Sequence, residues 1–289
     1  MPCPTIQPLS ADNDQNEKRV ITASAVVFLL IGAVLLIAPR ISNQIGKQEA
    51  QTAIEQFEEL KRSIESTSAA TNPTDETQPD ERDSKSGQAE VHGVVEHGVD
   101  TETRTVVYHI DADRLYRDSV AYNEKLKTHQ YDLLINEHSY QKASLNLYDY
   151  GVPNNIYGYI SATSIDMELP IYLGASEDNM AVGAAHLTNT SLPIGGKSTN
   201  CVLAAHTGYI GRVFFDYIRY LNIGDEIRIT NFWDTLSYRV TDKQIYKKYE
   251  SSNCYITDGK DLLTLITCAH GGADRYYVMC ERVDNLSTY

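Results

Sequence analysis

Cys268 and Arg275 flank the loop AHGGAD near the C-terminal end of the chain. The loop separates the apolar runs LLTLIT and RYYVMCERV, a pattern that predicts a β-hairpin. In an antiparallel pair the two residues would face each other across ~5 Å. A guanidinium beside a thiol favours the thiolate, and it offers hydrogen-bond donors to an oxygen that becomes negative during acyl transfer. The pattern therefore indicates a cysteine nucleophile with an electrostatic partner.

His206 ends another apolar run, CVLAA, in the same way that Cys268 ends LLTLIT. If the two runs form neighbouring parallel strands, ~4.8 Å apart, their ends place the imidazole and the thiol in one cleft. A nucleophilic cysteine needs such a base beside it. The spacing alone does not choose among His186, His206 and His270 as that base.

Each of these residues also has a structural interpretation. A cysteine after an apolar strand usually belongs to the core, and a polar residue in a turn is usually solvated. Arg275 could pair with Asp274 or Glu281. The joint placement of Cys268, His206 and Arg275 at strand ends favours the catalytic interpretation.

The five cysteines include no CxxC pair and no Cys/His spacing of a zinc site. We therefore expect neither a metal nor another cofactor. Four of the cysteines lie in the C-terminal part and would allow one disulfide, whose connectivity the sequence does not give. Cys201 and Cys280 lie inside apolar runs, where buried free thiols are the favoured interpretation.

Short apolar runs separated by turn-forming segments dominate the chain after residue 151. They predict seven or eight short strands in a mainly β domain, which we expect to form a closed or nearly closed barrel. Residues 112–150 contain neither Gly nor Pro and have helical spacing of apolar residues, so one or two helices should precede the strands. The runs are 156–162, 169–174, 201–206, 226–230, 236–246, 262–267 and 275–283.

An uncharged apolar run occupies residues 20–38, close to the ~20 residues that a transmembrane helix needs. A cleaved signal peptide is the alternative, but its apolar core is shorter, ~7–15 residues, and Pro-Arg at 39–40 makes a poor cleavage site. Basic residues flank the run on both sides, so the charge rule gives little guidance on orientation. We expect residues 1–19 to be a cytoplasmic tail and residues 106–289 to be an extracytoplasmic domain anchored in the cell membrane.

Residues 39–105 connect the two parts. Apolar residues recur at helical spacing within 44–64, which predicts an amphipathic juxtamembrane stalk that could pair with a copy of itself. Residues 67–90 are rich in Thr, Ser, Asp, Glu and Pro, which predicts a disordered linker. Residues 41–100 hold 13 acidic and 5 basic residues, or -8 of the net charge of -14. This acidity disfavours a nucleic-acid partner, since phosphate binding needs clustered Lys and Arg.

Three segments together resemble the sortase family. LLTLITC resembles the TLxTC signature, AVGAAHLTNTSLPIGGKSTNCVLAAHTGY resembles the region around the catalytic histidine, and VFFDYIRYLNIGDEI is similar to LFxDLxxLxxGD. The resemblance covers residues 122–283 and is nearest to class C, the pilin-polymerising sortases. Class C enzymes usually carry an Asp-Pro-aromatic lid, of which LYDYG at 147–151 is at most a remnant.

The resemblance implies an eight-stranded sortase barrel and a membrane-anchored cysteine transpeptidase. Cys268 would be the nucleophile, His206 the general acid/base and Arg275 the group that stabilises the oxyanion or substrate. By the same match, His186 has no catalytic role and His270 is a loop residue. The family cleaves an LPxTG-like sorting signal on a surface protein or pilin subunit, holds a thioacyl-enzyme, and passes the acyl group to an amine of a pilin lysine or a cell-wall precursor.

Two other functions remain open. An exported cysteine peptidase would use the same Cys268 and His206 but would let water finish the reaction. A non-enzymatic, membrane-anchored β-barrel adaptor would keep Cys268 as a structural residue.

Overall fold

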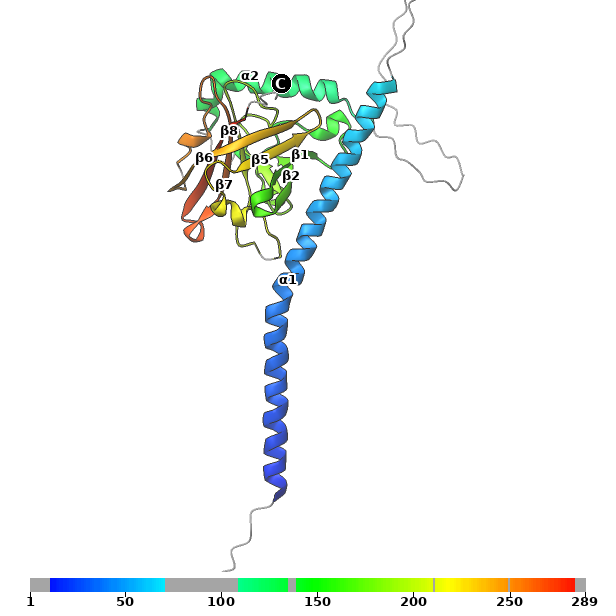
Figure 1. Ribbon diagram of the computed structural model, residues 1–289, viewed down its shortest axis with the longest axis vertical. Coiled ribbons are helices and arrows are strands. Elements are labelled where there is room, and N and C mark those ends of the chain that lie inside the picture. Colours follow the sequence, from blue (N-terminus) through cyan, green and yellow to red (C-terminus); the bar gives the residue numbers. More distant parts are fainter. Residues whose placement is uncertain (1–10, 71–108, 135–138, 210, 249, 284–289) are drawn as a thin grey trace, which may run out of the picture.

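The protein consists of a β-barrel with one long helix running along its side and beyond it (Figure 1). A computed structural model describes residues 11–70, 109–134, 139–209, 211–248 and 250–283. The long helix, α1, is Ala11–Ala70. A second helix, α2 (Ala112–Leu134), crosses the end of the barrel near the last turns of α1.

Eight strands close the barrel in the order β1-β2-β3-β4-β7-β8-β6-β5. This confirms the mainly β class and the closed architecture. The strands are β1 (Ile156–Ala162), β2 (Met167–Leu173), β3 (Ala184–His186), β4 (Thr199–Ala204), β5 (Glu226–Asn231), β6 (Thr235–Lys247), β7 (Asp261–Ala269) and β8 (Asp274–Arg282). Seven of them fall on the predicted apolar runs, and β3 is the addition.

Two strand pairs are parallel, β2 with β3 and β4 with β7, while the other neighbours are antiparallel. The predicted proximity of His206 and Cys268 requires that β4 and β7 be parallel neighbours. This parallel pairing is confirmed. Because side chains alternate along a strand, β7 sends Leu263 and Leu265 into the barrel core and Ile266 to the outer face.

The predicted helical region becomes α2 followed by two short 3-10 helices, Ser139–Gln141 and Leu147–Tyr150. α2 is fastened to barrel loops by buried amides. Leu192 N–H donates to Asn123 Oδ1 at 2.7 Å, and Ile256 N–H donates to Gln130 Oε1 at 2.7 Å. Five further short helices lie between the strands in the described part of the chain: Thr163–Ile165 (η3), Glu177–Met180 (α3), Phe215–Tyr220 (η4), Ser252–Cys254 (η5) and His270–Gly272 (η6).

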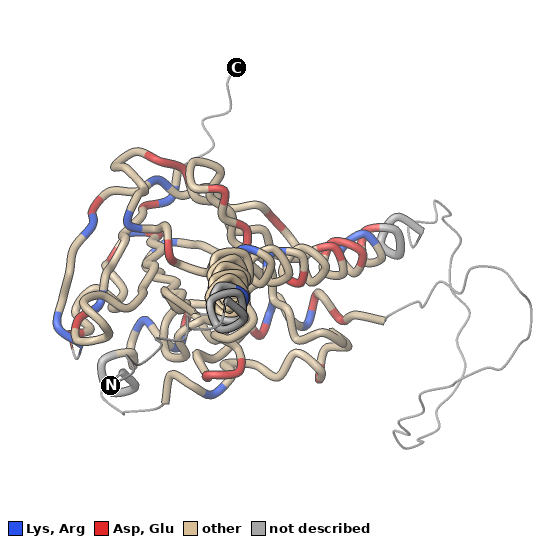
Figure 2. The backbone as a smooth tube through the Cα atoms, turned by 90° about the horizontal axis from the view of Figure 1, so that it is seen from below, with Lys and Arg blue, Asp and Glu red and all other residues tan. Residues whose placement is uncertain are grey.

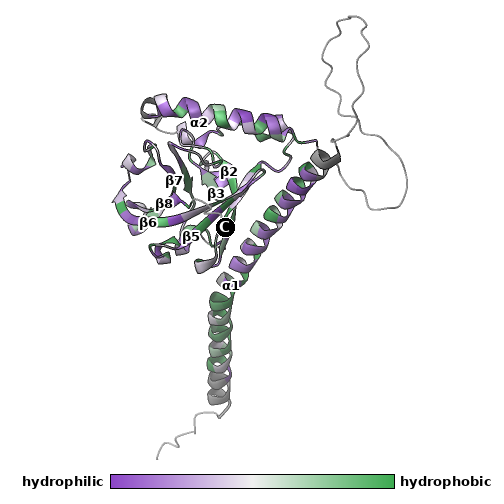
Figure 3. Ribbon diagram, turned by 45° about the horizontal axis from the view of Figure 1, so that its top comes forward, coloured by the Kyte–Doolittle hydropathy of each residue, from purple (hydrophilic) through white to green (hydrophobic). Residues whose placement is uncertain are grey.

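α1 joins the predicted apolar span and the predicted juxtamembrane helix in one element. Its residues 20–38 are apolar and mostly exposed, and this stretch is long and apolar enough to cross a membrane (Figure 3). Its C-terminal half packs on β1 and β2, with Phe57 0% exposed and its ring centroid 4.6 Å from that of Phe232. The helix predicted for residues 44–64 is therefore present and forms part of the barrel's second core cluster. It continues to Ala70, and residues 71–90 of the predicted linker lie outside the described residues.

Basic and acidic positions are interspersed over the described part of the chain (Figure 2). Many of them are paired locally, as in Lys127 with Glu124 and Lys260 with Glu281. Such exposed pairs add little to stability, ~0–1 kcal/mol each.

Candidate active site

The β7–β8 hairpin places Cys268 directly opposite Arg275. The strands run one residue further than the sequence suggested, to Ala269 and Asp274, and a short turn joins them. Gly271 and Gly272 in this turn have φ of +66° and +91°, a backbone region that favours glycine. Directly opposed residues project to the same face of a sheet, so the predicted pairing of thiol and guanidinium positions is confirmed.

The parallel β4–β7 ladder brings His206 to the same rim. Its register runs to Ala204 opposite Ile266, and Ala205 N–H extends it by donating to the carbonyl of Ile266 at 3.2 Å. Thr267 Oγ1 then donates to the carbonyl of Ala205 at 2.8 Å. The same register, extended by two residues, would set His206 level with Cys268. Cys268 and Arg275 lie at the ends of β7 and β8, and His206 follows the end of the adjacent strand β4 by two residues.

The site lies on the outer face of the barrel wall. On that face Val202, Ile266 and Tyr277 form a small apolar cluster, and Cys268 and Arg275 follow the same alternation as Ile266 and Tyr277. Cys268 is partly exposed, whereas residues 263–267 of the strand before it are buried. The Cys268 thiol at the end of β7 is thus accessible to solvent and lies next to this apolar cluster.

The guanidinium of Arg275 is fixed to its own turn. Nη1 donates to the carbonyl oxygens of Gly272 at 2.9 Å and Asp274 at 3.0 Å. The carboxylate of Asp274 binds His270 Nδ1 at 2.8 Å and Lys247 Nζ at 3.0 Å. The hydrogen bond from His270, followed by that from Lys247, lowers the pKa of Asp274.

The carboxylates that the sequence offered as partners for Arg275 are thus engaged elsewhere, since Glu281 pairs with Lys260. The arginine is held by backbone carbonyls instead, and no carboxylate in the described part of the chain pairs with it. This charge remains available to a negative group at the rim.

The three candidate histidines differ in their burial and in their contacts. His186 is fully buried, with Nε2 3.0 Å from the carbonyl oxygen of Ser191, and burial lowers its pKa to about 4. His270 is exposed and bound to Asp274. His206 is partly exposed, and its ring stacks on Tyr209 with centroids 5.2 Å apart and planes 17° apart.

Sequence reasoning did not single out two residues after His206, namely Tyr209 in the loop and Asp216 in the helix η4 that follows it. The carboxylate of Asp216 accepts from Gly208 N–H at 2.6 Å and Phe214 N–H at 3.0 Å, which closes the loop. The signal for Asp216 was its place in VFFDYIRY, where an acidic residue follows a glycine-containing turn. Nothing in residue spacing marks Tyr209, because its contact depends on how the loop folds back.

The remaining described cysteines differ from Cys268. Cys201, Cys254 and Cys280 are buried and free, which confirms the prediction for Cys201 and Cys280. Burial raises the pKa of all three thiols, that of Cys254 to about 12. Among the cysteines that the structure describes, Cys268 alone is reachable by solvent, and no group of three or more metal-binding side chains occurs in that part of the chain.

The possible lid remnant at 147–151 lies against α2. Tyr150 donates to Asp118 at 2.8 Å, and Arg114 of α2 lies over the Tyr150 ring at 4.9 Å from its centroid. Leu147 and Tyr150 are buried in the second core cluster. These contacts give the segment a structural role.

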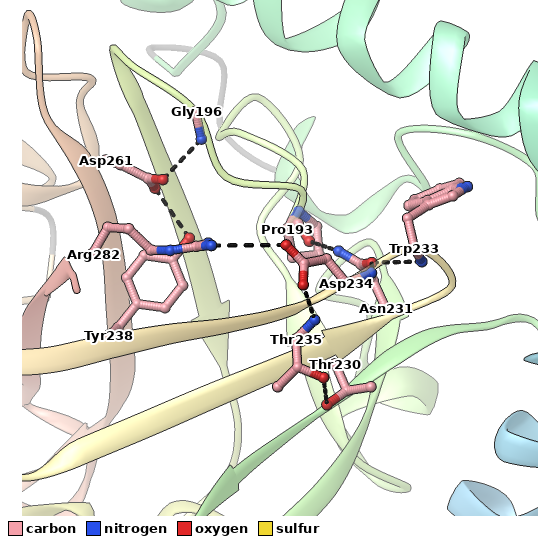
Figure 4. A network of polar contacts seen from close by, with 10 residues as sticks. All are labelled: Pro193, Gly196, Thr230, Asn231, Trp233, Asp234, Thr235, Tyr238, Asp261 and Arg282. Atoms are coloured by element: carbon pink, nitrogen blue, oxygen red, sulfur yellow. Dashed lines mark hydrogen bonds and ion pairs between the residues drawn. The ribbon is translucent and has the colours of Figure 1, made fainter. Parts of the chain in front are cut away.

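The opposite end of β7 carries a separate polar network (Figure 4). Asp261 accepts from Gly196 N–H at 2.8 Å and Tyr238 OH at 3.0 Å, and burial raises its pKa. Arg282 lies over the Tyr238 ring at 5.6 Å from its centroid and 3.9 Å from Asp234. This network ties the β5–β6 turn to the ends of β7 and β8 that lie farthest from the thiol.

Comparison with known proteins agrees with this geometry. The sortase domain model matches residues 160–283. Sortase A of Bacillus anthracis is 33% identical over 132 residues, which are 44% of this chain and 60% of that protein, so the chain spans about three fifths of the curated relative.

Solved structures of C-type sortases are similar over most of their length. Sortase C-1 of Streptococcus pneumoniae has a TM-score of 0.54 at 28% identity, covering 60% of this chain and 90% of that one. The pilus-related sortase C of Group B Streptococcus has a TM-score of 0.53 at 29% identity, covering 60% and 90%. Sortase C-1 of Actinomyces oris has a TM-score of 0.50 at 31% identity, covering 59% and 98%. With this likeness in sequence and barrel, the chain belongs to the sortase family of cysteine transpeptidases.

Proposed function

We propose that this protein is a membrane-anchored transpeptidase that cleaves an LPxTG-like sorting signal between Thr and Gly and transfers the acyl group to an amine. The observation that carries the proposal is the register of β4, β7 and β8: Ala204 pairs with Ile266, two residues before His206 and Cys268, and Cys268 pairs with Arg275. Family membership and the partial exposure of Cys268 among otherwise buried thiols support it.

Acylation begins when the Cys268 thiolate attacks the carbonyl carbon of the substrate threonine. A carbon–sulfur bond forms, and the carbonyl oxygen becomes negative near the Arg275 guanidinium. His206, as imidazolium, then protonates the glycine nitrogen, so the carbon–nitrogen bond breaks and a thioester remains. A positioned acid/base contributes roughly 10² to 10⁴ in rate, and an oxyanion donor about 10² to 10³.

Deacylation uses the same groups in reverse. Neutral His206 accepts a proton from the incoming amine while the amine nitrogen attacks the thioester carbon. The carbon–sulfur bond breaks, the new amide leaves, and the thiolate and imidazolium are restored. Water attacking in place of the amine would give hydrolysis, which is the activity of the peptidase alternative.

The likeness to pilus-related sortases supports a pilin lysine as one acceptor amine, and a peptidoglycan precursor is the other. The donor would be a surface protein or pilin subunit with a C-terminal sorting signal. We place residues 20–38 in the cell membrane, residues 1–19 in the cytoplasm and the catalytic domain, residues 106–289, outside. The apolar, exposed stretch of α1 at residues 20–38 supports this arrangement.

The test is incubation of the full chain in detergent with a sorting-signal peptide and an excess of an amine, followed by mass spectrometry. We expect an acyl-enzyme at Cys268 and a ligated product in preference to the hydrolysed peptide. Cys268→Ala should abolish both, and Cys3→Ser, which removes a thiol from the N-terminal tail, should abolish neither. Hydrolysis alone would favour a peptidase, and a Cys268→Ala variant that still forms an adduct would overturn the assignment.

A further inference from the structure

The loop that follows His206 packs against α1 just beyond the apolar span. Gly46 is buried at this contact, and a Cβ added to it would lie 2.6 Å from the carbonyl oxygen of Gly211 and 2.9 Å from Cγ of Arg212. In turn, a Cβ added to Gly211, whose φ is +85°, would overlap Ser42 Oγ. Helix and loop therefore meet at a spacing that no larger side chain at either glycine would permit.

An ion pair fastens the same contact. Arg212 of the loop pairs with Glu49 of α1, and the Arg212 side chain is only 25% exposed. A second pair, Lys47 with Asp166, also joins α1 to the barrel but reaches the residue after η3 and not this loop. Its side chains are 54% and 88% exposed, so solvent screens it more strongly than the Arg212 pair.

Contacts within the loop connect Arg212 to the imidazole of His206. Arg212 N–H donates to the carbonyl oxygen of Tyr209 at 3.3 Å, and the Tyr209 ring stacks on His206. Phe215 N–H donates to the carbonyl of His206 at 3.0 Å, which holds the start of the loop close to its end. Gly46 and Glu49 of α1 thus contact Arg212. Arg212 is hydrogen-bonded to Tyr209, and the Tyr209 ring stacks on the imidazole of His206.

We propose that Gly46 and Glu49 of α1 are positioning residues that set the orientation of His206 through Arg212 and Tyr209. The importance of this orientation rests on the proposed role of His206 as acid/base. α1 can act in this way because Phe57, three turns further along, fixes the same helix in the barrel core. Misplacement of a catalytic group by about 1 Å can reduce the rate ~10²-fold. A displacement of the loop that moves His206 should therefore lower kcat measurably.

The kinetic test compares matched glycine substitutions in the full chain in detergent. Gly46→Ala and Gly32→Ala both exchange a helical glycine of α1, but Gly32 has no atom within 4 Å of an added Cβ. We expect Gly46→Ala to lower kcat for transpeptidation by at least ~3-fold, within the range that misplacement produces, while KM stays unchanged. Gly32→Ala should change neither constant.

The ion pair gives a second comparison that does not depend on a glycine. Glu49→Gln should lower kcat in the same direction as Gly46→Ala, whereas Lys47→Gln should leave it unchanged. Exchanging the charges by Glu49→Arg together with Arg212→Glu should restore kcat relative to either single change. Equal effects of Glu49→Gln and Lys47→Gln would overturn the positioning role.

A spectroscopic test works without turnover. In a Cys268→Ala background with labelled histidine, the ring signals of His206 carry the ring-current shift of Tyr209, and Tyr209→Leu defines the unstacked position. We expect Gly46→Ala to move the signals toward that position and Gly32→Ala to leave them in place. If Gly46→Ala lowers only the unfolding temperature and moves no His206 signal, the contact is structural and the inference fails. If the unsubstituted chain forms no acyl-enzyme, the proposed function fails instead, and the spectra still decide the positioning.

Discussion

Cys268 and Arg275 are direct partners across the β7–β8 ladder, and the arginine is held by the carbonyl oxygens of Gly272 and Asp274. The guanidinium is therefore oriented before any substrate arrives. Because no carboxylate among the described residues neutralises it, its charge can act on the sulfur or on an oxygen that becomes negative beside it.

Arg275→Lys should reduce the rate of acylation about 10²-fold, since an ammonium cannot reproduce the guanidinium's fork of donors. The measurement is a single-turnover assay of thioester formation. Arg239→Lys, an exposed change on β6, serves as the control and should have no effect. Full acylation by the Arg275→Lys variant would show that charge alone, without geometry, suffices at this position.

Alkylation should distinguish Cys268 from the other described cysteines. In the folded protein a small alkylating reagent is expected to modify Cys268 and to spare Cys201, Cys254 and Cys280, because these three are buried and their pKa values are raised. Denaturant should expose all four. The check is peptide mapping by mass spectrometry, and resistance of Cys268 in the native state would support the adaptor alternative.

Phe57→Ala should destabilise the barrel by ~3–5 kcal/mol, the usual effect of truncating a buried phenylalanine. The reason is that Phe57 is 0% exposed and packs against Phe232. Denaturant unfolding of the full chain in detergent measures it. Phe28→Ala on the exposed apolar half of the same helix is the matched control, 73% exposed, and an equal loss in both variants would contradict the docking of α1.

Acid should destabilise the protein through His186. Burial lowers the pKa of His186 from 6.5 to about 4, so the unfolded chain binds the proton more readily between these values. The stability contributed by neutral His186 is complete above pH ~6.5 and is lost as the pH falls toward 4, by roughly 3 kcal/mol in all. The slope of stability against pH should be smaller in His186→Gln than in the exposed-site control His129→Gln. Parallel pH profiles for the two variants would refute this assignment.

The sequence allowed most of the barrel to be predicted, because strands such as β1 and β7 are continuous apolar runs bounded by turn residues. β3 was not predicted, since three residues show no periodicity and the strand exists only through its pairing with β2 and β4. Cys268 and Arg275 could be paired in advance because one hairpin fixes their register. The stacking of Tyr209 on His206 could not, because it depends on a loop that folds against α1.

The amphipathic pattern of residues 44–64 identified which face of α1 is apolar but not what covers it. The covering residues lie on β1, β2 and the β5–β6 turn, far away along the chain. A helical periodicity is equally consistent with a self-associating stalk and with docking on a sheet. The residues against which Phe57 packs come together only when the barrel closes.

A single helix that runs from the apolar span to the barrel also limits how far the enzyme can reach. From Ala38, where the apolar run ends, to the loop contact at Gly46 the helix rises only about 12 Å. With the apolar run embedded in a bilayer, the loop that follows His206 would stay at a nearly constant height, within about that distance of the end of the apolar run. A substrate would then have to present its scissile bond at that height, and the length of its own tether would decide whether it is accepted.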